Sequence, residues 1–95
     1  MKDRVTKGVS TMFYKVSEVM PLADYRLFVS FATGEKKQYN VKQLFDRWEP
    51  FKALLIIEGL FKQVRVDTGG YGVSWNDDID ISCNELYVNG TNATD

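Results

Sequence analysis

The chain has 95 residues, with 12 basic and 13 acidic side chains, no histidine and one cysteine. This length is typical of one domain with a single hydrophobic core, and the near-zero net charge excludes a general electrostatic attraction to nucleic acid or anionic lipid. The lone Cys83 excludes an intramolecular disulfide, and the apolar runs are too short to span a membrane. Because the sequence shows no secretory signal, we expect the protein in the reducing cytoplasm.

The hydrophobic pattern divides the chain into three parts. Residues 1–11 show no clear period and are predicted to be a flexible lead-in. Residues 89–95 are small and polar and are predicted to be a disordered tail. Residues 12–88 are predicted to form a single α+β domain.

Three strands are predicted at the start of this domain. Residues 12–20 form the first strand, and Pro21 ends it because proline cannot donate to a sheet ladder. Residues 25–31 alternate apolar and polar side chains, as a strand with one buried face does. Residues 32–34 predict a three-residue turn with glycine at the positive-φ position, after which residues 35–39 return as the third strand.

Two short helices are predicted next. Residues 41–48 carry apolar side chains at helical spacing, and Asn40 is a good N-cap. Residues 50–58 begin with proline in the first turn, where its missing N–H is tolerated. Because Ile56 and Ile57 broaden the apolar arc of this second helix, we expect it to be deeply buried or covered by a partner.

The last third of the domain returns to strands. Residues 63–67 and 71–75 alternate and predict a hairpin that completes the layer. Ile79 and Ile81 are predicted to anchor the C-terminal segment, and Ser82 begins a short helical turn as a capping residue. The predicted fold is therefore α+β: an antiparallel N-terminal three-stranded meander, two short central helices, a C-terminal β-hairpin and a final short helical turn.

The predicted core collects the inward-facing apolar positions of these elements. Its members are Val16, Leu27, Val29, Phe31, Leu44, Phe45, Phe51, Leu54, Leu55, Phe61, Val64, Val66 and Val73.

The residues that usually perform catalysis are scarce. The absence of histidine removes the commonest general base and metal ligand, and Cys83 is predicted to be a small buried hydrophobe. Asp77, Asp78 and Asp80 form the densest acidic group, but their spacing does not fit a calcium loop, so we interpret them as turn residues. An enzyme would have to use these carboxylates together with Asp67. We therefore predict that the protein is not an enzyme and has no catalytic residue, metal or cofactor.

Two sets of side chains are candidates for binding. Large aromatic residues are typical of protein interfaces, and the candidates for a partner-binding surface are Phe28, Trp48, Trp75 and Tyr87. Phe28 breaks the alternation of its strand, so either both faces of that strand are partly covered or Phe28 lies at a contact surface. A basic strand face for a small ligand or single-stranded nucleic acid would consist of Arg26, Lys36, Lys37 and Arg65. The simpler interpretation of the basic residues is a hydrated hairpin surface.

Asp24 and Asp80 are predicted to have structural roles, and Asp80, between Ile79 and Ile81, is placed to hydrogen-bond nearby backbone amides. The C-terminal third is acidic as a whole. It is either an ordinary solvated surface or a patch that meets a basic partner.

The order of landmarks along the chain resembles a known family. The landmarks are Val19 and Pro21; Asp24, Tyr25, Leu27, Val29 and Phe31; Gly34, Glu35, Tyr39, Val41 and Leu44; Phe51, Phe61, Val64, Val66 and Asp67; Gly70, Val73 and Trp75; and Asp80, Ile81, Leu86 and Tyr87. In this combination the chain resembles, over approximately residues 12–88, the small and mainly bacterial family catalogued as domain of unknown function 2442.

The resemblance implies a compact α+β fold and no established catalytic residue. Members of that family occur as short stand-alone proteins and joined to helix-turn-helix domains, and some are encoded beside another small uncharacterised family in a toxin–antitoxin-like pairing. The chain ends before any helix-turn-helix, so we expect no DNA binding through such a domain. The resulting hypothesis is a non-catalytic protein-interaction or regulatory module that acts with a small partner protein and also self-associates; the alternative is a small-ligand or nucleic-acid-binding domain.

Overall fold

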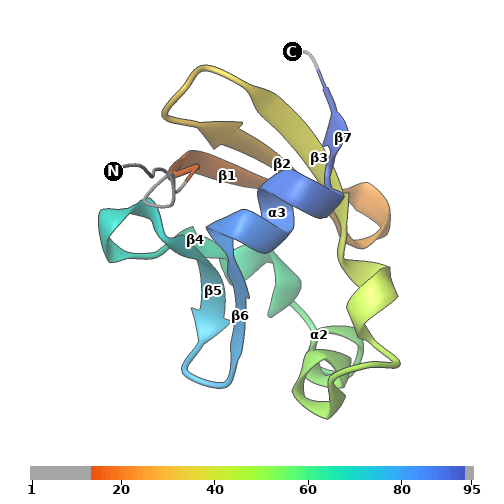
Figure 1. The fold of residues 1–95 in the computed structure, drawn as a ribbon. Coiled ribbons are helices and arrows are strands. Elements are labelled where there is room, and N and C mark those ends of the chain that lie inside the picture. Colours follow the sequence, from red (N-terminus) through yellow and green to blue (C-terminus); the bar gives the residue numbers. More distant parts are fainter. Residues whose placement is uncertain (1–13, 94–95) are drawn as a thin grey trace.

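The computed structural model describes residues 14–93 and contains two antiparallel sheets and two short α-helices (Figure 1). The first sheet has the order β1-β2-β3-β7, with β1 (Val16–Leu22), β2 (Arg26–Phe31), β3 (Lys36–Asn40) and β7 (Thr91–Asn92). The second sheet has the order β4-β5-β6, with β4 (Arg65–Val66), β5 (Gly72–Asn76) and β6 (Ile79–Ser82). The α-helices are α2 (Ala53–Ile56) and α3 (Cys83–Asn89). The predicted α+β class is confirmed.

The β2–β3 hairpin forms as its alternation predicts. Leu27, Val29 and Phe31 are buried on one side of β2, because every second side chain of a strand points the same way. Gly34 lies at φ 97°, and its N–H donates to the carbonyl of Phe31 at 2.8 Å. The glycine supplies the positive φ that this turn requires.

The prediction that Pro21 ends the first strand is wrong. β1 continues to Leu22, and Pro21 lies opposite Leu27 in the ladder. β1 is an edge strand, so part of its backbone faces away from any neighbouring strand and a missing N–H is tolerated there.

The predicted helix over residues 41–48 is wrong in type and length. Val41–Leu44 forms a 3-10 helix, and residues 45–47 continue as a turn. Asn40 nevertheless caps it as expected, since the Lys42 N–H donates to the Asn40 side-chain oxygen at 3.0 Å. Helix nucleation is costly, and a segment this short before a proline gains too few hydrogen bonds to form a regular α-helix.

The second predicted helix is also divided. A 3-10 helix, Glu49–Lys52, carries Pro50 in its first turn, and α2 follows it for one turn. Leu54 is buried in the core, whereas Leu55 is 49% exposed, so the predicted core position of Leu55 is wrong. One helical turn has a single inward-facing position, and Leu54 occupies it.

The C-terminal strands form a separate sheet and do not complete the first layer. Ile79 and Ile81, which we expected to anchor the C-terminal segment, are buried in a further strand, β6, which pairs with β5. The turn between these strands is closed by Asn76, whose side-chain oxygen accepts a hydrogen bond from the Asp78 N–H at 2.8 Å.

Helix α3 begins at the predicted cap and leads the chain back to the first sheet. The Glu85 N–H donates to the Ser82 hydroxyl at 3.1 Å. After α3, Thr91 and Asn92 pair with β3. Within the tail that we expected to be disordered, Asn89 therefore belongs to α3, and Thr91 and Asn92 form β7. The predicted lead-in, residues 1–11, and the last two residues of the predicted tail lie outside the described residues.

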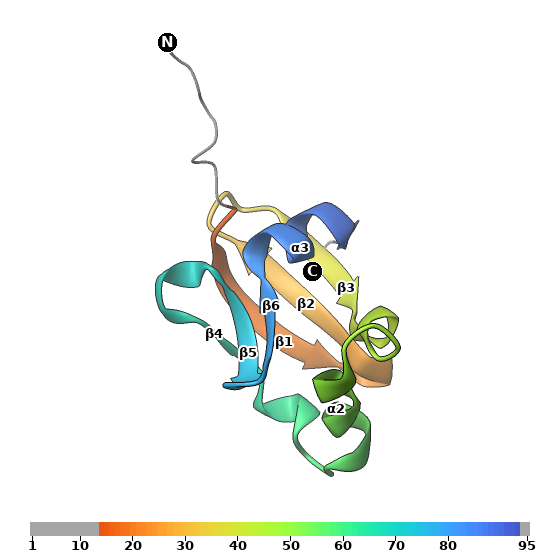
Figure 2. The same cartoon turned by 60° about the horizontal axis from the view of Figure 1, so that its bottom comes forward.

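The core lies between the first sheet and the layer of β5, β6 and α3, which Figure 2 shows in front of β1–β3. Most of the predicted core is buried; besides Leu55, the exceptions are Val64 and Val66, which are only partly buried against it. Cys83 is buried as a free thiol, as predicted. Further core members that we did not predict are Tyr39, Val41, Leu60, Trp75, Ile79, Ile81 and Leu86.

Candidate interaction surface

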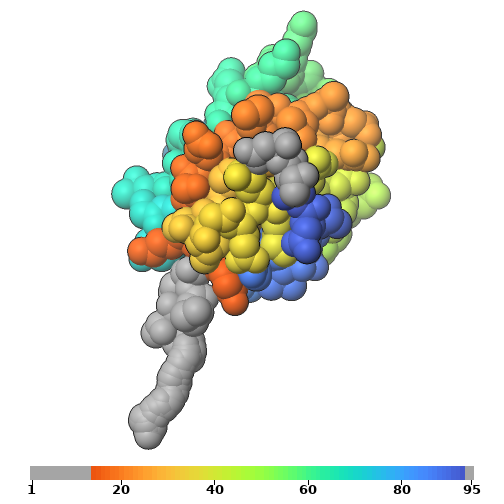
Figure 3. Space-filling model, turned by 90° about the horizontal axis from the view of Figure 1, so that it is seen from above, coloured from red at the N-terminus to blue at the C-terminus, as the bar shows by residue number. Residues whose placement is uncertain are grey.

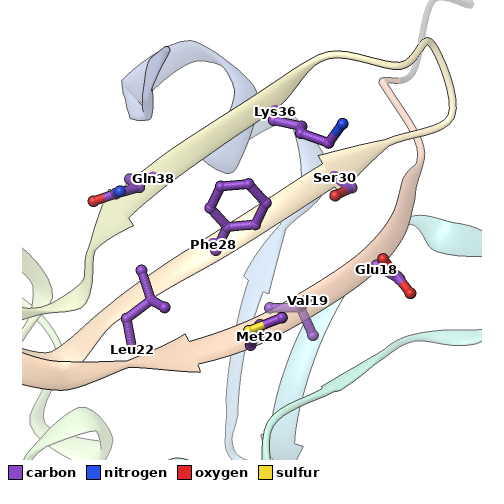
Figure 4. Close-up of a pocket in the computed structure, with 8 residues that line it drawn as sticks. All are labelled: Glu18, Val19, Met20, Leu22, Phe28, Ser30, Lys36 and Gln38. Carbon is purple, nitrogen blue, oxygen red and sulfur yellow. The ribbon is translucent and has the colours of Figure 1, made fainter. Parts of the chain in front are cut away.

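The side of the first sheet that faces away from α3 and the second sheet carries no described element (Figures 1 and 2). We call this side the outer face and define it by Glu18, Met20, Leu22, Phe28, Ser30, Lys36 and Gln38. These residues line a shallow hollow of about 530 Å³. Figure 4 shows the Phe28 ring standing between Met20 and Leu22 on β1 and Lys36 and Gln38 on β3.

Phe28 is therefore the apolar centre of the outer face. It is half-buried and lies opposite Met20 on one neighbouring strand and Gln38 on the other. Met20 is 57% exposed. We considered above that Phe28 lies either on a partly covered face or at a contact surface. Among the described residues, Phe28 lies at the surface, on the wall of the hollow.

A second apolar surface lies at the end of α2, and we call Leu55, Ile56 and Ile57 the aliphatic tip. Their exposed fractions are 49%, 79% and 54%. The helix ends here, because Ile57 has an extended backbone while its N–H donates to the Ala53 carbonyl at 2.9 Å. Three consecutive large aliphatic side chains consequently face away from the core.

The outer face and the aliphatic tip adjoin each other. A hollow of about 480 Å³ beside the tip is lined partly by Leu22, which also lines the hollow around Phe28. Figure 3 looks onto this side of the molecule, with β1–β3 in orange and yellow and the green chain after α2 projecting beyond them.

The four aromatic side chains predicted to bind a partner lie in different environments. Phe28 lies on the outer face. Trp48 is 56% exposed and lies between the 3-10 helices Val41–Leu44 and Glu49–Lys52. Trp75 is only 3% exposed, and its indole N–H donates to the Phe61 carbonyl at 2.9 Å. The prediction that Trp75 is a surface residue is wrong, because an inward position in β5 buries it; the fourth, Tyr87, is partly buried.

Tyr87 joins α3 to the hairpin. Its ring stacks on Tyr14 with centroids 3.6 Å apart, and the Lys37 ammonium lies 4.4 Å from its centroid. Its hydroxyl donates to the Glu35 carboxylate, with oxygen distances of 2.8 and 2.9 Å. The hydrogen bond to Glu35 raises the pKa of Tyr87 above its ordinary value. Most of this side chain is therefore engaged within the fold.

The four predicted basic residues do not form one face. Arg26 and Lys36 belong to the outer side of the first sheet, whereas Lys37 points to the opposite side. Arg65 lies on β4, where its guanidinium donates to the Trp75 carbonyl at 3.4 Å. The charges that a nucleic-acid groove needs are thus distributed over separate surfaces.

Asp24 has a structural contact in the turn between β1 and β2. Asp24 and Tyr25 both have positive φ, at 63° and 57°, and the Lys42 ammonium lies 2.8 Å from the Asp24 carboxylate. The hydrogen bond to Lys42 lowers the pKa of Asp24. Asp80 is exposed on β6 and lies opposite Ser74.

A buried polar contact that we did not predict connects Tyr39 to Glu85. The Tyr39 hydroxyl donates to a Glu85 carboxylate oxygen at 2.7 Å, although the tyrosine is only 1% exposed. Burial, followed by the contact with Glu85, raises the pKa of Tyr39 far above its ordinary value. The alternation of the hairpin places Tyr39 on the inward side, so its burial could have been predicted from the sequence. The alternation does not indicate that Glu85, a residue of α3, accepts the hydrogen bond.

The acidic residues considered for catalysis are separated. Asp67 accepts a hydrogen bond from a serine of β5 at 2.6 Å, whereas Asp78 and Asp80 border a surface hollow of about 320 Å³ beside Trp48. Among residues 14–93, no three acidic or cysteine side chains gather in a way that would hold a metal ion. Within the same range, no helix has the length and apolar content needed to cross a membrane.

Comparison with known proteins places this fold in a family. No curated protein and no solved structure matches the chain. The model of a family described as protein of unknown function (DUF2442) matches residues 16–92, which is almost the whole region that the structure describes. The chain therefore belongs to the DUF2442 family.

Proposed function

We propose that the protein is a non-catalytic protein-interaction module that binds a small, separate protein through the aliphatic tip, in a regulatory pairing of the toxin–antitoxin type. The observation that carries this proposal is the exposure of Leu55, Ile56 and Ile57 side by side. Burying a fully exposed side chain of this size contributes about 1.5–3 kcal/mol, and covering the exposed part of each of these side chains contributes a corresponding share of that energy. Contiguous apolar patches on soluble proteins commonly mark binding sites. The hollow beside the tip gives a partner's side chain room to enter.

The available side chains favour binding over catalysis. The chain has no histidine, and its most perturbed tyrosine, Tyr39, is engaged with Glu85 inside the fold. A catalytic site needs a base and a reacting group within hydrogen-bond reach of one accessible point. The separated aspartates supply no such arrangement among the described residues.

The alternative function, binding of a small ligand or nucleic acid to a basic face, gains no support from the structure. Arg26 and Lys36 share the outer side of the first sheet, whereas Lys37 lies on its opposite side and Arg65 lies on β4. If the alternative held, single-stranded DNA would bind at low salt, where phosphate contacts are strongest. We expect no such binding in a fluorescence-anisotropy titration.

The proposed compartment is the reducing cytoplasm. Cys83 is a buried free thiol, and no disulfide contributes to the fold of the described residues.

The test is affinity capture from cells of the source organism, followed by binding measurements with the purified partner. The key variant is Ile56→Glu, and the matched control is Val88→Glu, which makes the same chemical change at another exposed position. We expect a protein that the wild type and Val88→Glu bind equally and that Ile56→Glu binds at least about tenfold more weakly. A partner that Ile56→Glu retains, or the absence of any specific capture, would contradict the proposal.

A further inference from the structure

We propose that the outer face of the first sheet binds the same face of a second copy of this chain, with the two-fold axis parallel to β2. The inference adds self-association at the outer face to the proposed function, which assigns a different protein to the aliphatic tip. It rests on the register of β1, β2 and β3 and on the positions of two opposite charges.

The side chains of the outer face stand in three rows across the strands, and the last of these rows holds Leu22 and Arg26. In one row, Glu18 on β1, Ser30 on β2 and Lys36 on β3 are register partners. Neighbouring strands are about 4.8 Å apart, so Glu18 and Lys36 start about 10 Å apart on opposite sides of β2. The next row holds Met20, Phe28 and Gln38.

A two-fold rotation about the direction of β2 makes the charged row complementary to itself. The rotation exchanges the positions of β1 and β3, so Glu18 of each copy comes opposite Lys36 of the other. One contact thus produces two equivalent ion pairs, as an isologous interface requires. The charges fix the orientation, because the other in-plane axis would place Glu18 opposite the row of Leu22.

The same rotation places Phe28 of β2 on the two-fold axis. Phe28 meets Phe28 of the second copy, and Met20 meets its Gln38. The hollow of about 530 Å³ around Phe28 accommodates the opposing ring. An aromatic pair surrounded by polar and charged side chains is the usual anatomy of a protein interface.

The size of the face sets the strength of the contact. Three strands over two rows cover on the order of 200 Å² for each copy, less than the approximately 800 Å² of a standard stable interface. Arg26 would also lie opposite Arg26 of the second copy at one end, so the contact is confined to the other two rows. We therefore expect a weak, concentration-dependent dimer.

The experiment is sedimentation equilibrium of the full chain at concentrations up to about 1 mM, where weak dimers are populated. The variants are Glu18→Lys and Lys36→Glu, each measured alone and mixed in equal amounts. Each single variant brings like charges together, so we expect at least about tenfold weaker dimerisation. In the mixture both pairs are again opposite in charge, so the heterodimer forms as well as the wild-type dimer does.

The controls separate this contact from general effects. Asp77→Lys makes the same change in net charge as Glu18→Lys, but in the turn of the second sheet, and we expect it to dimerise like the wild type. Phe28→Asp abolishes the dimer, and circular dichroism verifies that the variant is folded. A wild type that stays monomeric over the whole range, or a mixture that fails to recover, would overturn the inference.

The two proposals fail in different ways. Ile56 belongs to the aliphatic tip, so we expect Ile56→Glu to dimerise like the wild type if the outer face is the dimer contact. Loss of the dimer in this variant would contradict the inference that the outer face is the contact. A monomeric wild type that still loses a captured partner through Ile56→Glu would refute the inference and leave the proposed function standing.

Discussion

The two faces of the first sheet are made by the same three strands, yet they have opposite characters. On the inner face, Leu27, Val29 and Phe31 are at most 2% exposed beneath the second sheet and α3. On the outer face, Phe28 is half-buried and Met20 is 57% exposed. Alternation therefore assigns each side chain to a face of the sheet, whereas the presence of a covering layer decides whether that face becomes part of the core.

Polar contacts differ between the faces in the same way. The Tyr39 hydroxyl donates to Glu85 inside the protein, so loss of that hydrogen bond leaves a carboxylate without its partner in a part-buried site. The ion pair of Lys42 with Asp24 is exposed, with side-chain exposures of 41% and 58%, and water replaces it at little cost.

Phe31→Ala and Phe28→Ala provide the largest contrast, because they make the same change on opposite sides of β2. We expect the first to lower the free energy of unfolding by about 3–5 kcal/mol, since it empties a fully buried site. The second should cost about 1 kcal/mol or less. Urea denaturation at low protein concentration measures both, and equal losses would show that another layer covers the outer face in solution.

Tyr39→Phe tests the inner polar contact. We expect a loss of about 1–3 kcal/mol at neutral pH, because Glu85 keeps its burial and loses its donor. The pKa of Tyr39 is raised above its ordinary value of 10.0, so its contribution is fully present below pH 10.0 and is lost as the pH rises through the folded-state pKa.

The measurement is urea denaturation of the wild type and the variant between neutral and strongly alkaline pH. The wild type should lose stability more steeply above pH 10.0 than Tyr39→Phe does. Tyr87→Phe is the control, because Tyr87 also has a raised pKa but lies nearer the surface. Parallel alkaline profiles for the wild type and Tyr39→Phe would contradict this account.

Lys42→Ala should have the smallest effect, a loss of stability well below that of Tyr39→Phe, and this loss should shrink at high salt. Its partner Asp24 has a pKa below the unfolded value of 3.8, so the contribution is present above pH 3.8 and is lost as the pH falls through the folded-state pKa. Denaturation at two salt concentrations measures it, with Lys62→Ala as the equal-charge control. A loss as large as that of Tyr39→Phe would remove the distinction between buried and exposed contacts.

Local signals in the sequence were sufficient for several elements. The alternation of β2 predicted its buried side, and the glycine at position 34 predicted the turn. The caps at Asn40 and Ser82 were also recognisable, because each depends on a hydrogen bond to an amide two or three residues away. Phe28 was identified as a surface candidate from the sequence because it is an apolar residue at a position where the alternation of β2 predicts a polar one.

Local sequence patterns thus account for the turns, the caps and the strand parities, whereas contacts between distant segments set which sides of these elements are covered. Pro21 is accepted in β1 because that strand lies at the edge of its sheet, and Trp75 is buried whereas Trp48 is exposed. Leu54 enters the core while Leu55 joins the aliphatic tip, although both are leucines in one helical turn. The physical reason is that a periodic pattern describes neighbours within one element, whereas burial depends on the layer that a distant segment supplies.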